Sequence, residues 1–519
     1  MGKIDWYKKN RRLSEFFNEE LQIECIETRS LGDLDPIITS LEYDSRKIKP
    51  GSLYFALAGL HKDGRLFIAD AIERGAVVVV YQTPLTDYSE RVVYIRVKDS
   101  RFSMSAIAAS FYGFPSEKLR CVGITGTEGK STTVFLIWQL LRMSGRQAGF
   151  ISTVQTSTGG ESEDNTEHQT TPEATVIHKQ LAQMLDNGVE FAVLETSSHG
   201  LSPKTNRLGD VVFTAGVMTN VTHEHLEFHG TWEQYRSDKA NLFRNLRVEG
   251  GFGVINADDP SCAYFAAVTD KPIFTYSTNP SSCADLSLLR IESFTSGNAY
   301  TVHVKETDEY IAIQDNLPGA FNVGNVMAAM LTVSKLLAIP IREAAALIPG
   351  LQPVRGRMTA VRKGQPFEVL VDYAHTPSSF QTIFPPLRER VKGRIISLFG
   401  SPGERDTKKR PEQGRVAALY SDIVILSDED PRGEASMSIL EEIAAGVPNL
   451  KRDQDLFLIP NRPLAIRKAF SLARDGDIVL LLGKGHENSI IYADGPIPYD
   501  EIAEAEKALA ELAQCCENT

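Results

Sequence analysis

Short apolar runs recur along the chain, and polar or glycine-containing segments separate them. In the first hundred residues such runs lie at 52–57, 76–82 and 91–97, and each is bounded by turn residues. Runs of this length that are rich in valine and aromatic residues predict β-strands. We interpret this part as a small α/β domain that ends near Pro115.

From residue 119 onward, apolar runs alternate with segments of helical period. The run at 121–125 precedes a predicted helix that ends at Gly145. The remaining runs of this set lie at 191–196, 211–221 and 251–259. Strands that alternate with helices form a parallel sheet, and ligands bind at the carboxyl ends of its strands.

The same alternation returns near the carboxyl end. It involves apolar runs at 367–374, 394–400, 422–428 and 477–485, and an amphipathic helix is predicted over 500–516. No G-x-G-x-x-G pattern accompanies these runs, so no dinucleotide is indicated. The prediction is an α/β protein with a central P-loop-type, mostly parallel sheet and a C-terminal doubly wound, Rossmann-like sheet. Its three domains are expected at 1–117, 118–352 and 353–519.

Composition and charge narrow the class of protein. The chain of 519 residues has 67 acidic and 55 basic residues and a formal charge of −12, which argues against nucleic-acid and membrane-surface binding. It has no apolar run long enough to span a bilayer, and its charged amino terminus lacks the apolar core of a secretory signal. Its six cysteines have neither metal-ligand spacing nor disulfide density. We expect a cytoplasmic monomer with reduced cysteines.

The segment GITGTEGKSTT at 123–133 lies between a predicted strand and a predicted helix. Glycines let backbone N–H groups face an anion, a lysine supplies positive charge, and a serine hydroxyl can bind magnesium. Ile124 stands where the general phosphate-loop pattern has its first glycine. A glycine-rich turn without a ligand is the alternative, but the position between strand and helix favours nucleotide binding.

Polar residues also follow the next predicted strands. Glu195 closes one apolar run and is a candidate to hold the magnesium of ATP, with a solvent-facing glutamate as the alternative. His223, His225 and His229 follow the run at 211–221, but their spacing is not a zinc signature. A magnesium or phosphate contact and a structural histidine both remain open. The polar segment 156–174 is predicted to be a loop, either a substrate contact or a surface excursion.

Four polar clusters end the strands of the C-terminal sheet. They are VDYAHTP, GSPGERDTKKRP, DEDPRGE and GKGHE. The carboxyl ends of parallel strands share one edge, so these clusters are predicted to form one rim. Arg405, Lys409 and Arg410 within them are candidates to bind carboxylate or phosphate groups, with solvated loops as the alternative.

Taken together and in this order, the motifs resemble those of the Mur ligases of peptidoglycan synthesis. They are most similar to the MurE type, which adds a diamino acid to UDP-N-acetylmuramoyl-L-alanyl-D-glutamate. The resemblance runs from DSRKIKPGSLYFALAGLHKDG near residue 44 to GKGHE near residue 487, and TNVTHEHLEFHG, D-P-R and GKGHE are its most specific parts. It implies an ATP-dependent ligase with one domain each for the UDP-sugar, ATP and the incoming amino acid.

The resemblance assigns roles residue by residue. ATP phosphates would be held by Gly126, Thr127, Glu128, Gly129, Lys130, Ser131 and Thr132. The base and ribose would be held by Asn322, Asn325, Arg357, Asp372 and His375. The UDP-sugar substrate would be held by Ser45, Thr170, Thr171, Ser197 and Arg207. Catalytic residues would be Lys130, Glu195, His225 and Lys239. Magnesium would be bound by Ser131, Glu195, His225 and Lys239, the last as a carbamate formed with carbon dioxide. Glu128 and Glu224 stand where the family usually has asparagine and aspartate, and the segment 201–207 is longer than usual.

The implied amino-acid pocket departs from one subtype of the family. Its residues would be Arg405, Glu429, Asp430, Pro431, Arg432, Gly483 and Glu487. Ligases that add meso-diaminopimelate carry D-N-P-R here, whereas this chain has E-D-P-R. The carboxylate of Asp430 would repel the extra carboxylate of diaminopimelate and attract an ammonium. We therefore expect L-lysine or ornithine as the added amino acid, with meso-diaminopimelate as the alternative.

The expected reaction is ATP-dependent amide formation. The γ-phosphate activates the D-glutamate side-chain carboxylate as an acyl phosphate, which the diamino acid then attacks. Ligases that extend folate or add D-Ala-D-Ala are alternatives, although the amino-terminal DSR segment and the DPR motif argue against both. A kinase or regulatory ATP-binding protein would need only the loop and the magnesium ligand.

Overall fold

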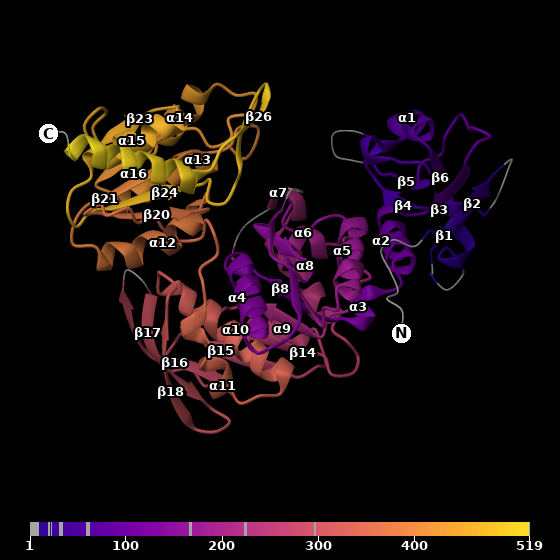
Figure 1. The fold of residues 1–519 in the computed structure, drawn as a ribbon, viewed down its shortest axis with the longest axis horizontal. Coiled ribbons are helices and arrows are strands. Elements are labelled where there is room, and N and C mark those ends of the chain that lie inside the picture. Colours follow the sequence, from indigo (N-terminus) through magenta and orange to yellow (C-terminus); the bar gives the residue numbers. More distant parts are fainter. Residues whose placement is uncertain are drawn as a thin grey trace. The chain divides into compact units, whose positions relative to one another are not determined.

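The computed structural model describes residues 10–18, 21, 23–30, 35–58, 63–165, 169–222, 226–294 and 297–517. The chain divides into two compact units, Met1–Ser287 with Met327–Ala344 and Leu288–Val326 with Ala345–Thr519. Both combine helices with sheets whose central strands are parallel (Figure 1), which confirms the predicted α/β class. The domain boundaries after residues 117 and 352 stay a prediction. Within the described ranges, no helix combines the length and apolar character needed to cross a bilayer.

A five-stranded sheet forms the amino-terminal part of the first unit. Its order is β2 (Cys25–Arg29), β7 (Val93–Val97), β6 (Ala76–Tyr81), β5 (Ser52–Ala56) and β4 (Ser40–Glu42). The three predicted strands are thus β5, β6 and β7. Successive side chains alternate between two buried clusters, one closed by α2 (Ser100–Phe111) and the other by α1 (Ile68–Glu73). The short strands β1 (Arg11–Arg12) and β3 (Ile37–Ile38) pair with each other, and α3 (Pro115–Lys118) follows α2.

The rest of the first unit is built on a mostly parallel sheet. Its order is β11 (Glu163–Asp164), β10 (Gln155–Ser157), β9 (Ala148–Ile151), β12 (Phe191–Glu195), β8 (Arg120–Thr125), β13 (Ala215–Met218), β14 (Phe252–Asn256) and β15 (Ile273–Ser277). Neighbours from β9 to β15 are parallel, as predicted. The helices between them are α4 (Lys130–Met143), α5 (Ala174–Asp186), α6 (Ser198–Leu201), α7 (Leu226–His229), α8 (Trp232–Arg244) and α9 (Cys262–Ala267).

Several strands lay outside the predicted apolar runs, among them β9, β15 and the strands described next. The prediction of a continuous loop over 156–174 is wrong, because Thr156 of β10 pairs with Glu163 of β11. After β15 the chain forms β16 (Leu286–Phe294), β17 (Gly297–Val304) and β18 (Glu309–Asp315), of which β17 and β18 belong to the second unit. β17 and β18 pair antiparallel, and side chains along β17 alternate between buried and half-buried. That alternation was the available sequence signal.

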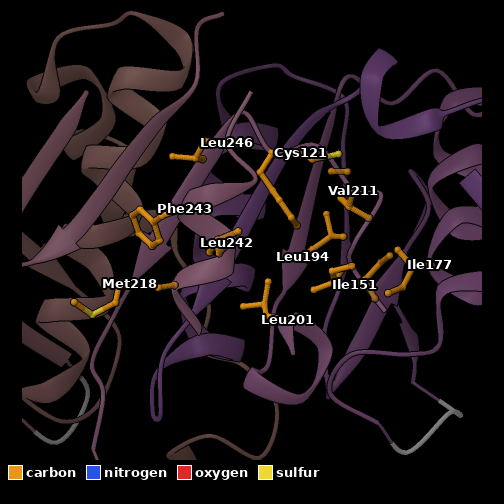
Figure 2. Packing of buried hydrophobic residues seen from close by; sticks show 14 of the residues in the cluster. Cys121, Ile151, Ile177, Leu194, Leu201, Val211, Met218, Leu242, Phe243 and Leu246 are labelled. Atoms are coloured by element: carbon orange, nitrogen blue, oxygen red, sulfur yellow. The ribbon is translucent and has the colours of Figure 1, made fainter. Parts of the chain in front are cut away.

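Helix α8 packs closely on β8 and β13 because each strand has a glycine beneath it. A Cβ on Gly123 would lie 2.4 Å from Leu242 Cδ1, and a Cβ on Gly216 would lie 3.3 Å from Leu242 Cγ. Leu242, Phe243 and Leu246 project into the buried core of this unit (Figure 2). The two glycines therefore bring α8 nearer to the sheet than larger residues would allow.

The second unit contains the predicted doubly wound sheet. Its order is β19 (Thr359–Ala360), β20 (Glu368–Asp372), β24 (Ile478–Leu482), β21 (Ile395–Phe399), β22 (Ile423–Leu426) and β23 (Leu456–Leu458). One face is covered by α12 (Pro377–Arg390), α13 (Lys409–Tyr420) and α14 (Ser436–Ala444), and the other by α15 (Arg462–Leu472) and α16 (Glu501–Glu517). Successive residues of β20, β22 and β24 alternate between the two buried clusters, which explains their uninterrupted apolar runs.

The described secondary structure also includes the hairpin of β25 (Ser489–Tyr492) with β26 (Gly495–Pro498), the helices α10 (Phe321–Leu337) and α11 (Ile341–Ala345), and short 3₁₀ helices.

The close packing at Gly123 yields a stability prediction. Gly123→Ala places a methyl group against Leu242 and is expected to lower the free energy of unfolding by about 1–3 kcal/mol. Denaturant titration measures the loss. Leu242→Ala costs stability by itself because Leu242 is buried, but in that background the further loss caused by Gly123→Ala should be smaller, since the added methyl then has room.

Gly160→Ala is the matched control, because a Cβ there meets nothing within 4 Å. The free energy of unfolding of this variant should stay close to that of wild type. Equal losses for the two glycine variants would contradict the packing argument.

Candidate functional site

The predicted phosphate loop joins β8 to α4. A Cβ on Gly126 would lie 1.9 Å from Thr219 Oγ1, and Gly129 has a φ of 83°, so both positions require glycine. Asn220, which follows β13, accepts the N–H groups of the two residues between these glycines, at 2.8 Å with its carbonyl and 2.9 Å with its side-chain oxygen. The neighbouring strand therefore fixes the loop conformation.

Glu128 is also held in this loop through its backbone. Its carbonyl accepts bonds from Thr219 Oγ1 at 2.6 Å and from Asn220 Nδ2 at 3.1 Å. Every residue type supplies these backbone atoms. This explains how the loop keeps its conformation with a glutamate at position 128.

Ser131 and Glu195 meet at the adjoining ends of α4 and β12. Ser131 Oγ lies 3.0 and 2.9 Å from the two carboxylate oxygens of Glu195, and the Thr153 N–H donates to the same carboxylate at 2.9 Å. Glu195 is buried. Hydroxyl and carboxylate oxygens are the hard ligands that magnesium prefers, so this pair fits the predicted metal site.

The other predicted metal ligands are only partly described. His225, like His223 and Glu224, lies outside the described residues. The described part of the chain has no group of three or more His, Cys, Asp or Glu side chains arranged to hold a metal ion. His229 is described, and it is a buried residue whose Nδ1 lies 2.7 Å from Asp238 Oδ2 and whose Nε2 lies 3.1 Å from Ser198 Oγ. Its contacts correspond to the structural alternative.

Helix α8 presents two side chains to the phosphate loop. Lys239 is 2% exposed, and its Nζ donates to the Gly126 carbonyl at 2.5 Å. Tyr235, one turn earlier, lies beneath the same ammonium, and its hydroxyl is 3.0 Å from Thr127 Oγ1. By pattern alone, Lys239 would be a surface lysine of a helix. The sequence pattern does not show that this lysine is buried beside the loop.

Thr171 joins several predicted substrate residues. Its hydroxyl donates to the Glu195 carbonyl at 2.9 Å and lies 3.0 Å from both the N–H and the Oγ of Ser197. Arg207 donates to the Thr171 carbonyl at 2.8 Å and to Glu173 Oε1 at 2.9 Å. Glu173, which the sequence reasoning missed, therefore orients the Arg207 guanidinium.

A cavity of about 270 Å³ brings many of the predicted residues together. It is lined by Gly126, Lys130, Gln169, Thr170, Thr171, Ser197, Ser198, His199, Arg207, Tyr235 and Lys239. The loop lysine, the threonine pair and Lys239 thus share one cavity. The sequence reasoning missed Gln169 and Tyr235 as lining residues, and it used Ser198 and His199 only as neighbours that favour a site at Glu195. Gln169 and Ser198 directly adjoin predicted site residues, His199 follows Ser198, and Tyr235 lies one helical turn from Lys239.

Ser45, the predicted amino-terminal substrate contact, is buried at the start of a short 3₁₀ helix, Ser45–Lys47. The preceding Asp44 side chain accepts the Arg46 N–H at 3.0 Å and so caps this helix. Ser45 is not among the described residues that line the cavity. Its contact with the UDP-sugar stays a prediction.

In the second unit, the predicted nucleotide residues gather around Tyr373. The Arg357 guanidinium lies 4.7 Å from the Tyr373 ring centre, and the His375 ring lies 4.7 Å from it. Asp372 accepts the N–H groups of Met358 and Ala374 at 2.8 and 2.7 Å, and burial raises the pKa of its carboxyl against the opposing charge of Arg357.

Asn322 and Asn325 lie on α10 and bond to each other at 3.1 Å. Asn322 also donates to the Pro318 carbonyl at 2.7 Å, which fixes its amide at the start of the helix.

The predicted amino-acid motifs are joined by a buried lysine. Lys484 Nζ donates to Asp430 Oδ1 at 2.9 Å and to Glu487, and Tyr373 donates to the other Glu487 oxygen at 3.3 Å. Burial would lower the pKa of Lys484, but the two carboxylates raise it, so the side chain is a cation. Gly403 donates to the Asp430 carbonyl at 2.8 Å. Loops after β20, β21, β22 and β24 therefore form one rim.

Glu429 differs from the other two acidic residues of this rim. Lys484 bonds to Asp430 and Glu487 but not to Glu429, which is 6% exposed and lies against Gly483. Burial raises the pKa of the Glu429 carboxyl to about 7, despite the nearby Lys409 and Lys484 charges. This carboxyl therefore titrates near neutral pH.

The candidate arginines have different environments. Arg405 is exposed on the loop after β21, whereas Arg432 is half-buried and has a φ of 54°, a strained conformation for a residue with a side chain. Arg410 is fully buried and bonds to Glu434, Glu442 and the Pro402 carbonyl. Its interpretation as a ligand group is therefore wrong, because its charge is satisfied within the fold.

Comparison with known proteins decides the family. Residues 37–112 match the catalytic domain of the Mur ligase family, residues 124–333 its middle domain and residues 356–485 its glutamate ligase domain. A UDP-N-acetylmuramyl-tripeptide synthetase of Treponema denticola is 51% identical over 516 residues, which cover 94% of this chain and 97% of that protein. The chain belongs to the Mur ligase family. Members of this family are ATP-dependent, ADP-forming ligases.

Other Mur ligases extend the likeness. A UDP-N-acetylmuramoyl-L-alanyl-D-glutamate–2,6-diaminopimelate ligase of Geobacillus thermodenitrificans is 39% identical over 92% of this chain and 96% of that protein. A solved structure with the same enzyme name is 27% identical, has a TM-score of 0.62, and overlaps 92% of this chain and 96% of that chain. The MurF ligase of Thermotoga maritima in complex with ADP, at 20% identity and a TM-score of 0.60, shares the fold over 91% of this chain and 98% of that chain.

The burial of Glu429 gives this Mur ligase a pH-dependent stability. The folded carboxyl binds a proton more tightly than the unfolded one, so stability falls as pH rises from about 4.5 to about 7. Glu429→Gln removes this titration. Between pH 4.5 and 8, the free energy of unfolding of this variant should rise by roughly 3 kcal/mol relative to that of wild type, at about 1.4 kcal/mol for each unit of pKa difference.

Chemical denaturation at a series of pH values tests this expectation. Glu389→Gln removes an exposed carboxyl of the same unit and serves as the control. A stability difference between Glu429→Gln and wild type that does not change with pH would show that Glu429 is not protonated near neutrality.

Proposed function

We propose that this Mur ligase joins a diamino acid to the D-glutamate of UDP-N-acetylmuramoyl-L-alanyl-D-glutamate. The supporting observation is the cavity that Lys130 of the phosphate loop shares with Thr170, Thr171, Ser197 and Arg207. The loop residues suit a nucleotide phosphate, whereas the hydroxyls and guanidinium suit an acidic substrate. The names of the 51% and 39% identical relatives support the same substrate.

The first chemical step would activate a carboxylate. An oxygen of the D-glutamate side chain attacks the γ-phosphorus, the bond to the bridging oxygen breaks, and ADP leaves an acyl phosphate behind. Lys130 and the N–H groups at the start of α4 would neutralise and bind phosphate oxygens. Arg207, oriented by Glu173 and Thr171, would hold the acidic substrate in line.

The second step would form the amide. The amine nitrogen of the diamino acid attacks the acyl carbon, inorganic phosphate leaves, and the nitrogen loses a proton. Arg405 and Arg432 would pair with the carboxylate of the amino acid, and Glu487 would accept from its amino group. Lys484 and Tyr373 hold the Glu487 carboxylate from two sides, which limits the positions it can take.

Ser131, Glu195, His225 and carbamylated Lys239 would hold magnesium. When bound, magnesium supplies positive charge beside the ATP phosphates. The Lys239 ammonium would first lose a proton, and the uncharged amine would then join carbon dioxide and release a second proton, so that a cation becomes an oxygen-bearing anion. The cavity beside this buried amine leaves room for the two added oxygens.

The added amino acid is proposed to be L-lysine or ornithine. Lys484 compensates part of the Asp430 charge, so that charge is weaker than the sequence alone suggested. The motif loops still place two carboxylates, those of Asp430 and Glu487, against one buried lysine, and the Glu429 carboxyl, whose pKa is raised to about 7, lies nearby. This excess of acid favours a side chain that ends in an ammonium over one that ends in a carboxylate. meso-Diaminopimelate is the alternative.

Purified protein tests the proposed function directly. ADP release should require both the UDP-muramoyl dipeptide and a diamino acid, with kcat/KM highest for lysine or ornithine. Asp430→Asn should shift kcat/KM toward meso-diaminopimelate by about tenfold, or about 1.4 kcal/mol. Glu389→Gln should leave the preference unchanged. ATP hydrolysis that ignores both substrates would contradict the ligase, and a wild-type preference for diaminopimelate would contradict the charge argument.

Carbamylation of Lys239 has its own test. Lys239→Arg keeps a positive charge but does not form the carbamate, and activity is expected to fall by about 10–100-fold or more, as for loss of a metal-orienting group. Carbon-13 NMR of wild type equilibrated with labelled bicarbonate should show a carbamate signal that the variant lacks. A wild-type spectrum without this signal, under conditions of full activity, would contradict the proposal.

A further inference from the structure

Arg462 is buried inside the second unit, directly behind the predicted amino-acid pocket. It is the first residue of α15, and its side chain is 0% exposed. Its guanidinium forms a bidentate pair with Glu501 of α16, with distances of 2.8 Å from Nε to Oε2 and 2.7 Å from Nη2 to Oε1. Tyr499 donates to the same carboxylate. Arg462 and Tyr499 therefore both hold the Glu501 carboxylate in place.

The remaining donors of Arg462 reach two backbone carbonyls. Nη1 donates to the Asp428 carbonyl at 3.1 Å, and Nη2 donates to the Leu482 carbonyl at 2.7 Å. Asp428 directly precedes the E-D-P-R segment, and Leu482 directly precedes GKGHE. One planar group therefore ties the starts of two loops that leave different strands.

A contribution to fold stability is by itself a weak explanation for this buried ion pair. Removing two opposite charges from water is costly, and a well-packed apolar pair often stabilises a fold as well or better. The guanidinium offers several donors in one rigid plane, which an apolar side chain and a lysine both lack. Its distinctive contribution is the fixed spacing of the two loops.

We propose that Arg462 is a positioning residue for the amino-acid pocket, one that sets the distance between the 429–432 and 483–487 loops. The inference rests on the proposed function of those loops. Lys484, from one loop, bonds to Asp430, from the other, and this bond requires the spacing that Arg462 maintains. A shift of either carbonyl would separate the groups that hold the diamino acid.

Arg462→Lys is the test variant, because it keeps the charge but loses the planar set of donors. KM for the diamino acid should rise at least about tenfold, the effect of losing one charge-assisted hydrogen bond, while KM for ATP and for the nucleotide-sugar changes little. Amide hydrogen exchange in peptides covering 428–432 and 483–487 should quicken. Glu501→Gln, a milder change to the same pair, should move both readouts in the same direction.

Arg467→Met is the matched control. Arg467 also joins α15 to α16, through Glu504 and Glu511, but it bonds to no residue of the two loops. It should lower Tm without raising KM for the diamino acid. The inference is overturned if Arg462→Lys and Glu501→Gln lower Tm but leave that KM and the loop exchange within about twofold of wild type. It is also overturned if Arg467→Met raises that KM equally. A wild type that turns over no diamino acid refutes the proposed function instead, and the exchange result then still decides whether Arg462 holds the loops.

Discussion

The approach of α8 to the central sheet is the constraint on which the candidate site depends. Gly123 and Gly216 leave space for Leu242, so the helix lies close enough for Tyr235 and Lys239 to reach the phosphate loop. From the other side, Thr219 and Asn220 hold that loop through its backbone. The cavity therefore takes its shape partly from strand glycines that are not among the residues lining it. A packed interior transmits small displacements, which makes such positions as important as those that line the cavity.

Much of this arrangement could be predicted because it depends on local pattern. Strands β8, β12 and β24 are buried on both faces, so their apolar runs were unambiguous, and polar residues directly after them were expected at the sheet edge. The glycines of the phosphate loop and Glu195 followed from the same reasoning. The rim of the C-terminal sheet was found in this way too.

Other features were beyond sequence reasoning because they depend on contacts between distant segments. The partner of Asp430 is Lys484, 54 positions later, and nothing near either residue indicates the pair. Arg410 lies in a basic stretch that suggested a ligand, but Glu434 and Glu442 of a different loop and helix satisfy it. Glu173 acts on Arg207 across a similar gap. In each case the charges were visible in sequence and their pairing was not.

The bond between Lys484 and Asp430 also bears on how this pocket can change over evolution. If residue 430 became neutral, Lys484 would keep its ion pair with Glu487, so one carboxylate would still balance the buried positive charge. Arg462 would continue to hold both loop starts through backbone carbonyls, which are independent of side-chain identity. A lineage can therefore exchange residue 430, which we propose faces the incoming amino acid, while the two loops keep their spacing and the buried lysine keeps a carboxylate partner.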